Sequence, residues 1–127
     1  MGELTGKVVV ITGGASGIGE ATTRRFVAEG AKVLIADMQQ KRGSSLAKEL
    51  GNNATFVSVE VRKETEIQTA VETAVDKWGR LDCMFNNAGF GGALGPIEDI
   101  PVEEFDMTFD VLVRSVFLGM KHAIPIM

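Results

Sequence analysis

Short, unbroken hydrophobic runs recur along the chain at regular intervals. Val8 to Ile11 are four apolar β-branched residues in succession, a pattern typical of a strand that is buried on both faces. Similar short runs rich in apolar residues follow, and each is bounded by polar residues or glycine. The four runs predict strands, which we place at 8–12, 31–37, 55–59 and 81–85.

Between these runs, hydrophobic residues recur at helical spacing. The three stretches that show this spacing predict helices at 18–29, 41–50 and 66–78. In the first of them, the shared inner face is expected to carry Ile18, Ala21, Thr22 and Phe26. Strands that alternate with helices are typical of right-handed βαβ units. The pattern therefore predicts an α/β fold: a parallel sheet of about four strands with helices on both faces.

The last predicted helix, 102–124, begins after Pro101 and is apolar on every side. Between Phe109 and Met120 only Asp110 and Arg114 are charged. Such a helix needs cover on two sides, and one side is expected to lie on the sheet. The other side requires a second surface, which is either a subunit partner or another part of the protein.

Composition narrows the class of protein. The chain has 127 residues, of which 45% are hydrophobic, so we expect one domain over 1–127. The net charge is −4 and the basic residues are scattered, which argues against a nucleic-acid surface. No apolar run approaches the ~20 residues of a membrane span. The single cysteine, Cys83, excludes an internal disulfide and favours a reducing compartment, so the expected location is cytoplasmic. We expect no metal site.

A glycine-rich turn connects the first strand to the first helix. It contains Gly13, Ser16, Gly17, Ile18 and Gly19. Glycines let the backbone turn sharply and approach a ligand, and the amide groups at the start of a helix bind phosphate. We interpret the turn as a pyrophosphate site in a Rossmann-like fold, with a purely structural tight turn as the alternative.

Asp37 ends the second strand, 18 residues after Gly19, where an acid that binds the adenosine ribose is expected. The extra phosphate of NADP would lie beside its carboxylate. Two unit charges ~4 Å apart repel by about 4 kcal/mol at an effective dielectric constant near 20. The sequence therefore predicts NAD in preference to NADP, with Met38 in the same site. The alternative is a solvated aspartate at a strand end.

Asn86-Asn87-Ala88-Gly89 follows the fourth strand. Small residues there let a cofactor pass close to the backbone, and the asparagine amides can bond to peptide groups at the strand ends. Asparagine and glycine also form ordinary turns. Because the carboxyl ends of parallel strands meet at one edge, we expect this segment to converge with 13–19, Asp37 and Glu60-Val61.

The order Thr-Gly-x-x-x-Gly-x-Gly in 12–19, with Asn-Asn-Ala-Gly in 86–89, resembles the short-chain dehydrogenase/reductase family over the whole chain. The best match is the NAD-dependent alcohol and steroid dehydrogenase type. The resemblance implies hydride transfer between NAD(H) and a secondary alcohol or ketone. It also implies cofactor contacts at Val111 and an adenine contact at Glu60, where the family has aspartate. In the family the last helix pairs with its twin, so a homo-oligomer through 102–124 is expected.

Two departures bear on activity. The chain has no tyrosine, and the family's catalytic Ser and Tyr-x-x-x-Lys belong to segments that would lie beyond Met127. The family's catalytic asparagine is replaced by Leu112. One hypothesis is that the chain is the cofactor-binding half of a dehydrogenase and is inactive alone. The other is that it is a truncated regulatory protein that binds nucleotide and associates through its last helix.

Overall fold

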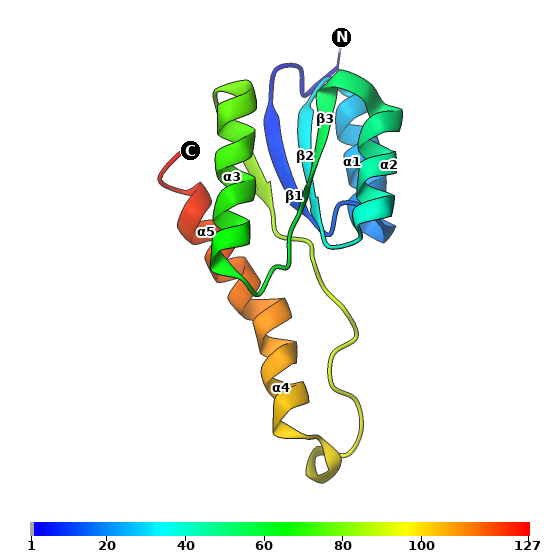
Figure 1. Cartoon of the computed structure of the whole chain (residues 1–127), viewed down its shortest axis with the longest axis vertical. Helices are drawn as coiled ribbons and strands as arrows, with labels where there is room; N and C mark the ends of the chain where they lie inside the picture. Colours follow the sequence, from blue (N-terminus) through cyan, green and yellow to red (C-terminus); the bar gives the residue numbers. More distant parts are fainter. Residues whose placement is uncertain (1) are drawn as a thin grey trace.

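The computed structural model describes residues 2–127 and contains a parallel sheet of four strands in the order β3-β2-β1-β4 (Figure 1). All three neighbouring pairs are parallel. The predicted α/β, Rossmann-like fold is therefore confirmed. The strand bounds differ from the predicted ones by at most two residues: β1 (Val8–Thr12), β2 (Lys32–Asp37), β3 (Ala54–Ser58) and β4 (Cys83–Phe85).

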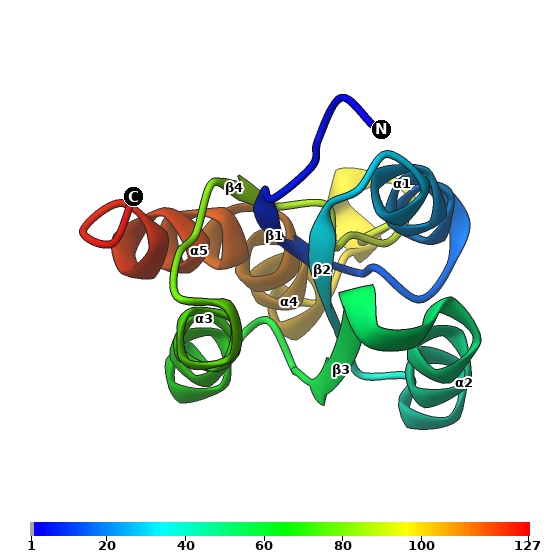
Figure 2. The same ribbon diagram turned by 90° about the horizontal axis from the view of Figure 1, so that it is seen from above.

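Helices cover both faces of the sheet, as Figure 2 shows from above. On one face lie α1 (Gly17–Ala28) and α2 (Gln40–Leu50). On the other lie α3 (Glu64–Trp78) and α5 (Ser115–Ala123). No helix in the described part of the chain is long and apolar enough to cross a membrane.

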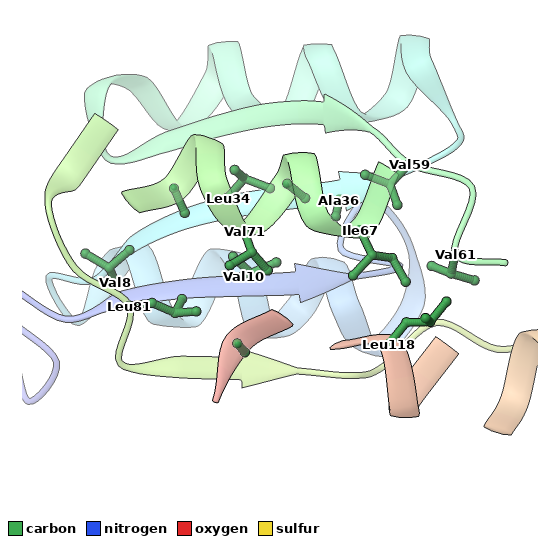
Figure 3. Packing of buried hydrophobic residues seen from close by; sticks show 13 residues of the cluster. Val8, Val10, Leu34, Ala36, Val59, Val61, Ile67, Val71, Leu81 and Leu118 are labelled. Atoms are coloured by element: carbon green, nitrogen blue, oxygen red, sulfur yellow. The ribbon is translucent and has the colours of Figure 1, made fainter. Parts of the chain in front are cut away.

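Two hydrophobic clusters, one on each face, hold these layers together. Side chains of a strand alternate between faces, so Val8 and Val10 point to one face while Val9 and Ile11 point to the other. The first cluster is completed by Ile67 and Val71 of α3 and by Leu118 of α5 (Figure 3). The second contains Leu46 of α2, with Phe26 and Val27 of α1 packed against it.

The predicted inner face of α1 is wrong at Ile18 and Ala21, whereas Phe26 packs against the second cluster as predicted. Ile18 is 74% exposed and Ala21 is exposed, whereas the buried residues of the helix are Gly19 and Thr23. The cause is the close approach of the helix start to the glycine-rich turn: a Cβ at Gly19 would overlap the carbonyl oxygen of Gly13. Only a small side chain fits where the helix begins, so the larger Ile18 is exposed, while Phe26 further along the helix contacts the core.

The last helix extends beyond the carboxyl edge of the sheet (Figure 1). It consists of α4 (Val102–Phe109), a π-helical turn η3 (Asp110–Arg114) and α5 in direct succession. Leu118 and Ala123 are buried against the core, while the opposite side is exposed. The exposed large hydrophobic residues of this helix include Phe105, Phe109, Val113, Phe117, Met120 and Ile124.

Candidate functional site

A pocket of about 530 Å³ lies over the carboxyl ends of the strands. This volume is in the usual range for sites that bind small molecules. The four predicted segments converge in its wall. The predicted residues that line it are Gly13, Ser16, Gly17, Ile18, Asp37, Met38, Glu60, Val61, Asn87, Ala88, Gly89 and Val111. Gly19 lies beneath the turn, against Gly13 and Asn87.

The glycine-rich turn requires its glycines for conformation and for space. Gly13 has φ +66°, and a Cβ there would lie 3.0 Å from Cα of Ala88. The turn leads into α1, whose N-cap Ser16 makes no side-chain capping hydrogen bond. The first amide groups of a helix have no partner within it, and the helix dipole places positive charge behind them. This wall of the pocket is therefore suited to an anion.

Asp37 is buried, with 6% of its surface exposed, so it is not a solvated strand-end residue. Its Oδ2 accepts a hydrogen bond from the backbone N–H of Ala15 at 3.0 Å, which ties β2 to the glycine-rich turn. Its Oδ1 accepts from the backbone N–H of Gln39 at 2.9 Å and from Gln39 Nε2 at 3.4 Å. The carboxylate thus forms part of the pocket wall and fixes the shape of that wall.

Thr12 joins the ends of β1 and β4. Its Oγ1 accepts hydrogen bonds from the backbone N–H groups of Asn87 and Ala88, both at 3.0 Å, and donates to the carbonyl of Phe85 at 3.4 Å. Asn87 reciprocates, because its Nδ2 donates to the carbonyls of Thr12 at 3.1 Å and Gly13 at 3.3 Å. As expected, an asparagine amide bonds to peptide groups at the strand ends, and the 87–89 segment is held against the glycine-rich turn.

At the end of β3, Glu60 pairs with Arg62 within the pocket wall. Glu60 Oε1 accepts from Arg62 Nε at 2.8 Å. The hydrogen bond that Arg62 donates to Glu60, followed by the charge of Glu60, raises the pKa of the Arg62 guanidinium above its ordinary value. Glu60 is therefore not a free exposed carboxylate.

The wall nearest the last helix is apolar. Val111 of η3 and Met107 of α4 line the pocket. Leu112, at the position of the family's asparagine, lies against Gly89: a Cβ at Gly89 would be 3.2 Å from Leu112 Cδ2. A leucine there supplies no polar atom to a proton relay.

Sequence reasoning missed several residues that shape the site. Thr12 is the first residue of the glycine-rich motif, and the sequence alone does not indicate its hydrogen bonds. Gln39, Arg62 and Met107 line the pocket and were not predicted from the sequence. Gln39 connects two predicted residues, since its Nε2 donates to Ser16 Oγ at 3.2 Å as well as to Asp37. The position of Gln39, two residues after the strand-end aspartate, was the available signal.

Fold and pocket together define a Rossmann-like α/β protein with a nucleotide-type site at the carboxyl edge of its sheet. The family model described as short chain dehydrogenase matches residues 7–127. The chain therefore belongs to the short-chain dehydrogenase family.

Individual relatives agree with this assignment. The chain is 48% identical to Short chain aldehyde dehydrogenase 1 of Euphorbia lathyris, over 98% of its own length and 44% of that protein. It is 48% identical to the mitochondrial borneol dehydrogenase of Lavandula x intermedia, covering 98% and 48%. It is 47% identical to xanthoxin dehydrogenase of Arabidopsis thaliana, covering 98% and 46%.

A solved structure is also similar: the 3-ketoacyl-(acyl-carrier-protein) reductase of Brucella melitensis complexed with NADH. The two superpose with a TM-score of 0.93 at 40% identity, over 98% of this chain and 51% of that one. The chain thus spans about half the length of the relatives it matches.

Proposed function

We propose that the chain is the cofactor-binding half of an NAD(H)-dependent oxidoreductase that acts on a secondary alcohol or ketone. The observation that carries the proposal is the juxtaposition of the buried Asp37 carboxylate and the start of α1 in one pocket wall. Several relatives are dehydrogenases or reductases by name, which supports the reaction class.

The order of the strands suggests how the cofactor lies. In the sequence β3-β2-β1-β4, the carboxyl ends present Glu60, Asp37, the glycine-rich turn and Asn87 in turn. With pyrophosphate at the turn and ribose at Asp37, adenine lies over Glu60 and Val61. The nicotinamide, which carries the hydride, then lies near Asn87, Ala88 and Gly89. In this arrangement the chain's own residues bind and orient the cofactor.

Asp37 is proposed to select NAD over NADP. The geometric basis is that two backbone N–H groups, at 3.0 and 2.9 Å, hold its carboxylate in place. The carboxylate cannot move away from the additional ribose phosphate of NADP without breaking these hydrogen bonds. Repulsion of about 4 kcal/mol corresponds to roughly a thousandfold difference in affinity.

Isothermal titration with NAD and NADP tests this. We expect the wild-type chain to bind NAD more tightly, and Asp37→Ala to narrow the difference in Kd roughly 100- to 1000-fold. A thermal melt of the variant controls for folding, because Ala15 and Gln39 lose an acceptor. A folded wild-type chain that binds neither nucleotide at millimolar concentration, or prefers NADP, would refute the proposal.

Catalysis is proposed to need residues that this chain does not have. With no tyrosine and with Leu112 at the family's asparagine position, the isolated chain should give no change in NADH absorbance with a panel of secondary alcohols. Restoration of activity in a longer chain would support the dehydrogenase hypothesis over the regulatory one. Turnover by the isolated chain would contradict the proposal that catalysis needs residues which this chain does not have.

We also propose that the exposed side of the last helix binds a second copy of the chain. The exposed residues Phe105, Phe109, Val113 and Phe117 recur every four positions, and the rings of the first two lie 4.8 Å apart. Such a stripe is costly to leave in water. Light scattering should show a dimer or larger species that Phe117→Glu dissociates, whereas a wild-type monomer would refute self-association.

A further inference from the structure

The ion pair of Glu60 and Arg62 lies at the end of the pocket above β3, on the side of Asp37 away from the glycine-rich turn. Both side chains are partly buried, with 21% of Glu60 and 38% of Arg62 exposed. Both residues line the pocket over the carboxyl ends of the strands, so a ligand bound there can reach their donors and acceptors.

The backbone on both sides of the pair is anchored. The backbone N–H of Glu60 donates to Glu66 Oε1 at 2.9 Å, at the start of α3. The carbonyl of Arg62 accepts from Arg114 Nε of η3 at 3.4 Å. The pair therefore has a fixed place between α3 and the last helix.

The pair also has unused hydrogen-bonding capacity. Its internal bond uses Oε1 of Glu60 and Nε of Arg62. Within residues 2–127, Oε2 of Glu60 and the two terminal nitrogens of Arg62 make no hydrogen bond to another residue. One carboxylate acceptor and a set of guanidinium donors thus lie side by side.

We propose that Glu60 and Arg62 together read the Watson–Crick edge of the adenine ring of the cofactor. Oε2 of Glu60 accepts from the 6-amino group, and a terminal N–H of Arg62 donates to N1. This inference rests on the proposed function, which places adenine over the end of β3. It adds Arg62 as a specificity-determining residue to the single carboxylate contact that the family resemblance implies.

The same pair should reject hypoxanthine. That base carries a carbonyl in place of the 6-amino group and a hydrogen on N1, so its acceptor faces Glu60 and its donor faces Arg62. Two acceptors then face each other at Glu60 and two donors at Arg62, so neither charged group makes a hydrogen bond to the base. A hydrogen bond to a charged group is worth about tenfold to a hundredfold in affinity.

The test is titration with NAD and with nicotinamide hypoxanthine dinucleotide, which differ only at this edge. The wild-type chain should bind NAD at least about tenfold more tightly. Arg62→Met removes the donors and should bring the two Kd values within about threefold. Glu60→Gln supplies an amide N–H that suits the hypoxanthine carbonyl, so it should also reduce the preference.

Arg80→Met is the matched control. Arg80 pairs with Asp82 at 2.6 Å, again two residues apart, but this pair precedes β4 and is outside the pocket. Its removal should leave the NAD preference unchanged. Circular dichroism establishes that each variant is folded, and Glu60→Gln provides an independent result if Arg62→Met is not.

Equal binding of both dinucleotides by the wild-type chain would overturn this inference while leaving the proposed function intact. An unchanged preference in Arg62→Met would do the same, and would instead fit a guanidinium stacked on the face of the ring, which does not distinguish the two bases. Failure of the wild-type chain to bind NAD would overturn both proposals.

Discussion

Replacement of Thr12 by valine should destabilise the fold, chiefly through the backbone amide of Ala88. The change keeps the branched shape of a side chain that is only 3% exposed. It removes the hydroxyl oxygen that accepts from Asn87 and Ala88, both at 3.0 Å. The N–H of Ala88 then lacks its acceptor, and valine occupies the space in which a water would have to replace it, whereas the N–H of Asn87 keeps the carbonyl of Phe85 at 3.0 Å.

The magnitude follows from the desolvation of those amides. An unsatisfied buried N–H costs about 1–3 kcal/mol. The amide of Ala88 is half-buried and that of Asn87 keeps one of its two acceptors, so we expect a loss of about 1–3 kcal/mol in the free energy of unfolding. That is a large share of the 5–15 kcal/mol typical of a domain. Thr12→Ser keeps the hydroxyl and loses one methyl group, which costs about 1 kcal/mol.

Urea unfolding followed by circular dichroism measures the difference. The midpoint of Thr12→Val should fall by roughly 0.5–1.5 M relative to wild type, and that of Thr12→Ser by less. The valine variant should also bind NAD more weakly, because the 87–89 segment forms part of the pocket. If Thr12→Val is no less stable than Thr12→Ser, the hydrogen bonds to the Thr12 hydroxyl do not have the role assigned to them.

Three further outcomes are expected. A Cβ at Gly43 would overlap the Phe56 ring, so Gly43→Ala should lower the thermal midpoint by the equivalent of about 1–3 kcal/mol; an unchanged midpoint would contradict the packing of α2 on β3. The hydrogen bond from Lys121, followed by that from His122, lowers the pKa of Glu64 below its ordinary 4.5. The stabilisation from this pairing is therefore present above that value and is lost as pH falls through the lower folded pKa, so Glu64→Gln should flatten the acid limb of a plot of melting temperature against pH. Burial, and then the charge of Asp82, raise the pKa of the Cys83 thiol; iodoacetamide should therefore alkylate it more slowly in the folded chain than in urea, and equal rates would show that it is accessible.

The elements of the fold could be predicted because each is marked locally. Val8 to Ile11 have the apolar run of a doubly covered strand, and Gly30 and Gly79 follow the last turns of their helices. The face of α1 could not be predicted in the same way. Periodicity assigns the large Ile18 to the inside, whereas the contact between Gly19 and Gly13 leaves room only for small side chains.

The candidate site was predictable to the extent that its residues follow strand ends. Topology alone brings Gly13, Asp37, Glu60 and Asn87 to one edge of a parallel sheet, and the structure places all four in the pocket wall. Hydrogen bonds between distant positions leave no such trace in a single sequence. The hydrogen bonds that Thr12 accepts from Asn87 and Ala88 span 75 and 76 residues, and nothing in the spacing of polar residues indicates them.

The hydrogen bonds of Asp37 explain how one carboxylate can hold the turn and still bind a sugar. A carboxylate has about four acceptor sites, and the firm bonds from Ala15 and Gln39 backbone N–H groups use two of them. The third contact, from Gln39 Nε2 at 3.4 Å, is long and comes from a side chain that can rotate away. In the proposed complex a ribose hydroxyl takes that place, so binding exchanges a weak hydrogen bond for a stronger one without releasing the turn. The additional ribose phosphate of NADP, in its dianionic form, has no proton to donate in the same position. The two hydrogen bonds from backbone N–H groups prevent the carboxylate from moving away from it.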